Sequence, residues 1–198
     1  WNYRNRYNNE NIFDYIYVIL ENHMRLRNNL TEYGLISKAF HWVSAAVLII
    51  QIPLGFYLVD LDFSERRLTV ENIHVILGLT VLYLTLLRLI YKIFNPTPPL
   101  GNSIFPGQRL IAKLNHTFLY LCILTITISG ALKKLFNGEM LNFFLFTAEI
   151  KDNFELAELY YEIHIIGNYT LIGLISLHIL AVIIHRVLFK ENLVQKIL

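Results

Sequence analysis

Four stretches of the chain are each long and apolar enough to cross a membrane, and this feature limits the fold more than any other. They run over about residues 39–59, 73–94, 114–132 and 163–189, and a helical span needs roughly 20 mainly apolar residues. Charged residues make up 16% of the chain, against about 25% in soluble domains. Helices in lipid hide their polar positions by packing against one another. The sequence therefore predicts an all-α, integral membrane four-helix bundle.

The composition excludes several classes of function. A formal net charge of +2 offers no basic surface for nucleic acid. The single cysteine, Cys122, excludes an intrachain disulfide framework and cysteine-ligated iron–sulfur clusters. The common nucleotide-binding, zinc-protease and hydrolase motifs do not occur in the sequence. Any chemistry must therefore come from residues other than those motifs supply.

Basic residues predict how the bundle is oriented. Residues 1–38 and 190–198 are expected to be tails on a transmembrane domain at 39–189, with Met24 as a candidate natural start that would leave residues 1–23 outside the native chain. With the N-terminus inside, twelve Lys and Arg residues lie on the inner side and five on the outer side. Both termini are therefore expected on the cytoplasmic side of a multi-pass protein, in the inner membrane if the source is bacterial.

Histidines are the strongest candidates for function, because ionisable residues inside a membrane are costly. Those in or at the edges of the spans are His41, His74, His116, His164, His178 and His185. His164 and His178 are 14 residues apart, so they share one helix face at a separation of about 21 Å, near opposite membrane surfaces. One metal ion cannot be bound by ligands that far apart. Two stacked haems can be, each completed by a second histidine from another helix.

Depth in the membrane selects those second histidines. His74 begins the second span at the outer surface, level with His164, and His41 lies near the inner start of the first span, level with His178. The sequence therefore predicts an outer pair, His74 with His164, and an inner pair, His41 with His178, each holding the iron of one haem b.

The remaining candidates lie close to these two levels. His116 and His185, near the inner face, would either replace a ligand of the inner pair or bind a quinone carbonyl. Arg88 is the one arginine deep in a span and falls near the inner haem, where it would pair with a propionate. A missing side chain lets a flat macrocycle approach the backbone. The glycines expected to do so at the outer level are Gly55, Gly78 and Gly130.

With these elements in order, the chain resembles the bacterial cytochrome b561 family, a group of small dihaem membrane proteins. The resemblance covers roughly residues 33–197. The segments that carry it are 37–42 (SKAFHW), 73–75 (IHV) before Gly78, Arg88 before 95–99 (NPTPP), 114–116 (LNH), and the series His164, Gly173, His178, His185 and 190–192 (KEN). The resemblance implies the same two histidine pairs that depth selects.

The resemblance also implies an activity, superoxide:quinone oxidoreduction. It implies that the position of His185 contacts ubiquinone or another quinone, with Ser44 and Lys92 as further members of that site by position. The expected function is therefore electron transfer across the membrane, from a periplasmic donor such as superoxide to quinone at the cytoplasmic side.

Two alternatives stay open at this point. The first is a haem-bearing membrane anchor subunit of a larger dehydrogenase, of the hydrogenase or formate dehydrogenase type, with acidic outer segments as its docking face. Such a subunit would co-purify with its catalytic partner. The second is a haem-free transporter whose histidines handle metal ions or protons, which would purify without visible absorbance.

Overall fold

Four long helices make up most of the structure, a computed structural model that describes residues 26–98, 106–190 and 192–198. The helices are α2 (Leu35–Val59), α3 (Glu65–Phe94), α4 (Gln108–Phe136) and α5 (Phe154–Leu188). A two-stranded hairpin of β1 (Leu141–Asn142) and β2 (Thr147–Ala148) and a 3-10 helix, η1 (Leu193–Lys196), complete it. The hypothesis that Met24 is the natural start, with residues 1–23 outside the native chain, concerns residues outside those described.

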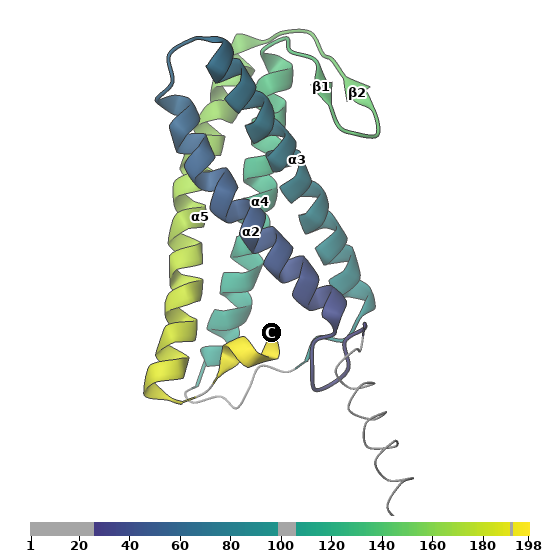
Figure 1. The fold of residues 1–198 in the computed structure, drawn as a ribbon, viewed down its shortest axis with the longest axis vertical. Helices are drawn as coiled ribbons and strands as arrows, with labels where there is room; N and C mark the ends of the chain where they lie inside the picture. The colour runs from purple at the N-terminus through teal and green to yellow at the C-terminus, as the bar shows by residue number, and fades with distance from the viewer. Residues whose placement is uncertain (1–25, 99–105, 191) are drawn as a thin grey trace, which may run out of the picture.

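The helices run up and down beside one another in a bundle (Figure 1). The most extensive packing is between α4 and α5, and α3 packs against α2 and, slightly less, against α4. We call the end formed by the connections 60–64 and 137–153 the loop end, and the end that holds the start of α2, the end of α5 and η1 the terminal end. Each helix is long and apolar enough to cross a membrane. The predicted all-α membrane bundle is therefore confirmed.

Two of the helices extend well beyond their apolar stretches at the loop end. α3 begins at Glu65 after Ser64, whose hydroxyl accepts a hydrogen bond from the Arg67 amide at 3.3 Å. α5 begins after Asn153, whose side-chain oxygen accepts from the Leu156 amide at 3.1 Å. Such caps satisfy amides that the first helical turn leaves without partners. Capped polar turns therefore continue these helices out of the membrane.

Burial in the bundle follows the pattern of a membrane protein rather than a soluble one. Large apolar side chains such as Ile49, Ile93 and Val187 are exposed on the outside of the helices. The buried residues include polar ones, among them Ser44, Thr85, Ser129 and His185. An apolar exterior around a partly polar interior is stable when lipid surrounds the bundle.

The hairpin in the α4–α5 connection is not anticipated by the sequence patterns above. Its strands pair antiparallel, Leu141 with Ala148 and Asn142 with Thr147. Leu141 is buried in a small apolar cluster with Leu79 of α3 and Leu135 of α4. The hairpin therefore packs over the seam between α3 and α4.

Candidate functional site

Two histidines from different helices face one another near the loop end. The rings of His74 on α3 and His164 on α5 have centroids 6.1 Å apart and planes inclined by 73°. An imidazole nitrogen binds a metal at about 2 Å, and the ring centre lies roughly 1 Å further, so two imidazoles on opposite sides of one iron have centroids roughly 6 Å apart. The separation of these two rings fits one iron between them.

The ring of His164 is held in one tautomer. Its Nδ1 lies 2.9 Å from the carbonyl oxygen of Ile126, and a carbonyl only accepts, so Nδ1 carries the proton. Nε2 is then the nitrogen with a lone pair for a metal, which is the usual arrangement of a ligating histidine. A Cβ at Gly130 would lie 2.9 Å from this Nδ1. The close approach of α4 to the imidazole therefore requires glycine at that position.

The ring of His74 lies against a second glycine. A Cβ at Gly55 of α2 would approach His74 Cε1 to 3.0 Å. The Nδ1 atom of His74 is buried with no hydrogen-bond partner among the described residues, an expensive state for a polar atom. Gln51 donates to the backbone oxygen of His74 at 2.9 Å, and its amide nitrogen would lie 3.2 Å from a Cβ at Gly78. The missing side chain at Gly78 thus leaves room for Gln51, whereas those at Gly55 and Gly130 leave room for the two imidazoles.

Three histidine rings converge near the terminal end. The ring of His178 on α5 lies 6.4 Å from that of His41 on α2 and 5.3 Å from that of His116 on α4, centroid to centroid. The structure therefore brings together both pairs that depth selects, and it also brings His116 to the second of them. That third ring is the alternative ligand that the sequence left open.

Arg88 reaches the same group of rings from α3. Its Nη2 atom lies 3.2 Å from Nδ1 of His41, and its guanidinium carbon lies 5.5 Å from the ring centre of Tyr120. The Lys92 ammonium stands 5.1 Å from the centre of the same ring. Tyr120 was missed by the sequence reasoning, although its position one turn after His116 on α4 places it on the same helix face.

His185 is buried further toward the terminal end. Its Nε2 atom lies 3.0 Å from Nε2 of Gln108, the first residue of α4, and its ring centre lies 5.5 Å from that of Phe189. The hydroxyl of Ser44 donates to the Phe40 carbonyl of its own helix at 2.6 Å. The sequence reasoning also missed Gln108. A polar side chain at the start of a membrane helix, at the depth of His185, could have indicated it.

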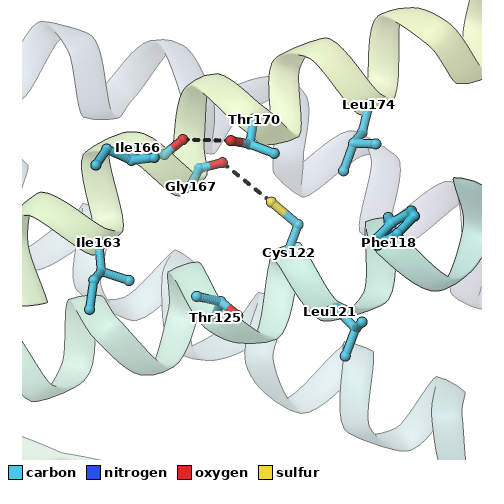
Figure 2. Close-up of a pocket in the computed structure, with 9 residues that line it drawn as sticks. All are labelled: Phe118, Leu121, Cys122, Thr125, Ile163, Ile166, Gly167, Thr170 and Leu174. Carbon is cyan, nitrogen blue, oxygen red and sulfur yellow. Dashed lines mark hydrogen bonds between the residues drawn. The ribbon is translucent and has the colours of Figure 1, made fainter.

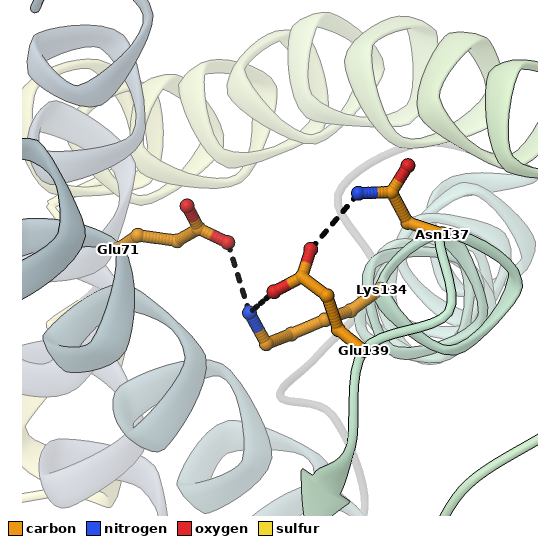
Figure 3. A network of polar contacts seen from close by, with 4 residues as sticks. All are labelled: Glu71, Lys134, Asn137 and Glu139. Atoms are coloured by element: carbon orange, nitrogen blue, oxygen red, sulfur yellow. Dashed lines mark hydrogen bonds and ion pairs between the residues drawn. The ribbon is translucent and has the colours of Figure 1, made fainter. Parts of the chain in front are cut away.

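The loop end carries a network of charged side chains that joins α3 to α4 (Figure 3). The Lys134 ammonium lies 3.0 Å from a carboxylate oxygen of Glu71 and also contacts Glu139, which accepts a hydrogen bond from Asn137 at 3.0 Å. Partial burial alone would raise the pKa of Glu139, but the hydrogen bonds and the positive charge of Lys134 outweigh it and hold that pKa below its ordinary value. Lys134 is therefore occupied by two carboxylates.

The other basic residues at this end differ in how they are used. Arg67 donates to two backbone carbonyls where α2 ends, and the Arg66 guanidinium lies 5.6 Å from the ring centre of Tyr57. Lys133 lines a hollow of about 280 Å³. Among the described residues no carboxylate lies within ion-pair distance of Lys133. Lys133 and Arg66 are therefore the two of these cations whose side chains have no ion-pair partner or backbone hydrogen bond among the described residues, and Glu158 lines the same hollow as Lys133.

A second surface hollow is a separate feature. A groove of about 430 Å³ runs between α4 and α5, where the Cys122 thiol donates to the Gly167 carbonyl at 3.3 Å and Thr170 donates to the Ile166 carbonyl at 2.9 Å (Figure 2). Its lining is apolar, and none of the candidate histidines contributes to it. The groove therefore belongs to the lipid-facing exterior.

The types and positions of the candidate ligand residues distinguish a site for a single metal ion from paired haem ligands. Across the described ranges, no group of three or more His, Cys, Asp or Glu is arranged to hold one metal ion. The candidate ligands instead form groups of imidazoles at two depths, centred on His164 and His178, about 21 Å apart along α5. Imidazoles facing each other in pairs match the requirements of bis-histidine haem.

Comparison with known proteins gives a consistent result. Residues 32–198 match the family model described as prokaryotic cytochrome b561. "Cytochrome b561 homolog 2" of Escherichia coli (strain K12) is 30% identical over 122 residues, which are 61% of this chain and 65% of that protein, just under two thirds of its length. "Probable superoxide oxidase CybB" of Yersinia pestis is 25% identical over 166 residues, which are 81% of this chain and 92% of that protein.

Proposed function

This chain belongs to the prokaryotic cytochrome b561 family, and from that premise we propose that it carries electrons across the membrane from superoxide to a quinone. Membership makes it a multi-pass membrane protein of haem b electron transfer. Bound haem supplies a one-electron redox centre, while the protein supplies ligation, position and electrostatics. The donor, the acceptor and the number of haems are the parts that we propose.

The observation that carries the proposal is the presence of facing imidazoles at two depths of one bundle. We assign His74 and His164 to one haem b and His41 and His178 to a second. At the first site the proton on Nδ1 of His164 leaves Nε2 for the iron, and Gly55 and Gly130 supply the space that the imidazoles need. Gly78 lies at the same level of the bundle, where it leaves room for the Gln51 side chain that donates to the backbone of His74.

Arg88 is assigned to a haem propionate at the second site. When an imidazole binds iron through Nε2, its Nδ1 carries the proton and becomes a donor. Nδ1 of His41 would then no longer accept from Arg88, which now lies 3.2 Å away. Ligation by His41 therefore frees the guanidinium for an anionic partner, and a carboxylate is the partner that arginine pairs with best.

The loop end is proposed as the donor side. Superoxide is an anion, and Lys133, in a hollow that Glu158 also lines, is a cation of this end without an ion-pair partner among the described residues. The hollow that Lys133 lines is formed with the first two turns of α5, Phe154 to Tyr161, which lead along the helix to His164. The Yersinia pestis relative, named as a probable superoxide oxidase, supports this choice of donor.

The terminal end is proposed as the quinone side. His185 is buried near the mouth of the bundle and is already in polar contact with Gln108, so both can orient a quinone carbonyl. Ser44, Lys92 and His116 are assigned to the same region. The excess of Lys and Arg at this end supports a cytoplasmic position for both termini. A bacterial inner membrane is the location that satisfies these assignments.

The experiment that tests the function is a reduced-minus-oxidised visible spectrum of detergent-purified protein, with haem extracted as the pyridine haemochrome. We expect two b-type haems per chain, and superoxide should reduce them while a short-chain ubiquinone reoxidises them. One haem per chain would show that one of the two proposed histidine pairs does not bind haem. A colourless, fully helical protein would contradict the proposal and favour the transporter, and stable co-purification of a catalytic subunit would favour the dehydrogenase anchor.

Replacing His185 is expected to affect quinone and leave the haems in place. His185→Ala should keep two haems per chain and slow quinone reduction about fivefold, since one hydrogen bond is worth roughly 1 kcal/mol. Stopped-flow reoxidation of the dithionite-reduced protein by ubiquinone measures the rate. His185→Gln, which retains a hydrogen-bond donor, should recover part of it. Equal rates for His185→Ala and the unaltered protein would reject this role.

A further inference from the structure

We propose that the hairpin of residues 141–148 lies in the hydrocarbon of the loop-end leaflet, as a lipid-facing cover over the seam between α3 and α4. Connections between membrane helices ordinarily lie in water, because lipid cannot satisfy their backbone groups. Four observations on this connection point the other way. They concern its depth, its composition, its backbone hydrogen bonds and the conformation of its tip.

The depth of the hairpin is fixed by its contacts with α3. Leu141 packs against Leu79, and the Tyr83 hydroxyl donates to the Phe143 carbonyl at 2.7 Å. Leu79 and Tyr83 follow Glu71 by about 12 Å and 18 Å of helix rise, and the long tyrosine side chain leans back toward the loop end. Residues 72–87 of α3 include no charged residue. The hairpin therefore folds down beside the apolar part of α3, as Figure 1 shows.

The composition of the hairpin suits lipid. Residues 140–148 (MLNFFLFTA) carry no charge between Glu139 and Glu149. Leu145 is 84% exposed and Phe146 is 58% exposed, and Met140 and Phe144 are exposed as well. A continuous group of large apolar side chains of this kind is uncommon on a surface that faces water. Because this group lies next to the lipid-facing side of α3, we expect lipid acyl chains to surround it.

The backbone of the hairpin has internal partners. The two strands pair with each other, and the Phe143 amide donates to the Phe146 carbonyl at 2.8 Å. The Phe144 amide donates to the side-chain oxygen of Asn142 at 2.9 Å, and the Phe143 carbonyl accepts from Tyr83. Non-helical backbone is tolerated at membrane depth when it is satisfied within the protein. The hairpin meets that condition for the amide and carbonyl of Phe143, the amide of Phe144 and the carbonyl of Phe146.

The tip conformation gives a fourth reason. Phe144 has a φ of 66°, in the left-handed region that a bulky side chain adopts only with strain. Turns of this kind in water normally have glycine at the position. Phe144 instead directs a ring toward that of Tyr83, with centroids 5.9 Å apart. This backbone conformation places the partly exposed Phe144 ring beside α3, where it adds to the apolar area that lipid would cover.

Site-directed spin labelling tests the placement directly. In a Cys122→Ser background, a nitroxide is attached to Leu145→Cys in the full-length protein, reconstituted in phosphatidylethanolamine and phosphatidylglycerol vesicles. Collision rates with oxygen, which concentrates in hydrocarbon, and with a water-soluble nickel chelate are then measured. Two matched positions calibrate the scale: Ile166→Cys, exposed on the lipid-facing side of α5, and Lys151→Cys, exposed in the same connection.

We expect the label at Leu145 to behave like the one at Ile166, with oxygen collisions several-fold more frequent than nickel collisions. A label that meets the nickel chelate as often as the one at Lys151 would place the hairpin in water and overturn the proposal. Low collision rates with both reagents would show that protein, such as a second copy of the chain, covers the hairpin, and would overturn it as well. Haem content is measured on the same samples, so failure of the electron-transfer proposal is seen independently.

Discussion

The variant His164→Ala is expected to purify with one b-type haem per chain instead of two. His164 is the residue whose ring faces His74 across 6.1 Å, and its Nδ1 is already committed to the Ile126 carbonyl. If Nε2 of His164 ligates the haem as we propose, alanine removes that ligand, and the facing imidazole of His74 would be left without its partner. The haem proposed near the terminal end should remain, because His178 lies about 21 Å from His164 along α5.

Haem per chain is measured by pyridine haemochrome, and helix content by circular dichroism. A folded variant with one haem fits the assignment. A folded variant that keeps two haems would show that His164 is not a ligand, and loss of both haems with helix content retained would show that the two sites do not form independently. External imidazole supplies the missing ligand, so it should restore part of the lost absorbance in His164→Gly.

The substitution Gly130→Ala is a smaller change at the same site, and we expect it to lower the haem occupancy. A Cβ at this position would lie 2.9 Å from Nδ1 of His164 and must displace the ring from its hydrogen bond. Disturbing the hydrogen bond that orients a metal-binding histidine in this way typically weakens metal binding about 10–100-fold. Gly173→Ala is the matched control, because a Cβ at Gly173 meets no atom within 4 Å. If both substitutions reduced haem occupancy equally, the effect would come from the helix backbone and not from the imidazole.

The fold and the two histidine levels follow from the sequence because they depend on quantities that a helix fixes. The length of an apolar stretch sets whether it can span a membrane, and a constant rise per residue turns the 14-residue interval between His164 and His178 into a distance. Depth then limits the partners of each to residues at the same level. This explains how His74 and His41 could be chosen without knowledge of how the helices pack.

The remaining features depend on how the helices are rotated and tilted against one another. The Ile126 carbonyl, Gln51 and Tyr120 acquire their contacts with the site only when neighbouring helices pack in one particular way. The hairpin escaped notice for a different reason. Its strands are two residues long, too short for an alternating pattern, and its turn has Phe144 where a glycine would signal it. Depth selected His41 for the inner pair but left His116 open as a replacement ligand, because both α2 and α4 begin at the terminal end.

The choice between His41 and His116 as the partner of His178 can be tested by the haem content of single variants. We expect His41→Ala to lose the haem near the terminal end and His116→Ala to retain it. The ring of His41 lies 6.4 Å from that of His178, close to the 6.1 Å of the loop-end pair and to the roughly 6 Å that one iron between two imidazoles requires. The ring of His116 lies 5.3 Å from that of His178, too near for an iron to lie between two nitrogen ligands without rearrangement.

The three single variants at this end form an internally controlled set. His178→Ala should lose the haem whichever partner is correct, so it fixes the spectrum and potential of the protein with the loop-end haem alone. Potentiometric titration of His41→Ala should then give the same single component, while His116→Ala should still give two. The opposite result would assign ligation to His116 and leave His41 paired with Arg88, in the contact of 3.2 Å that it makes now. In that case Arg88 would not be released for a propionate, so one set of spectra decides both assignments.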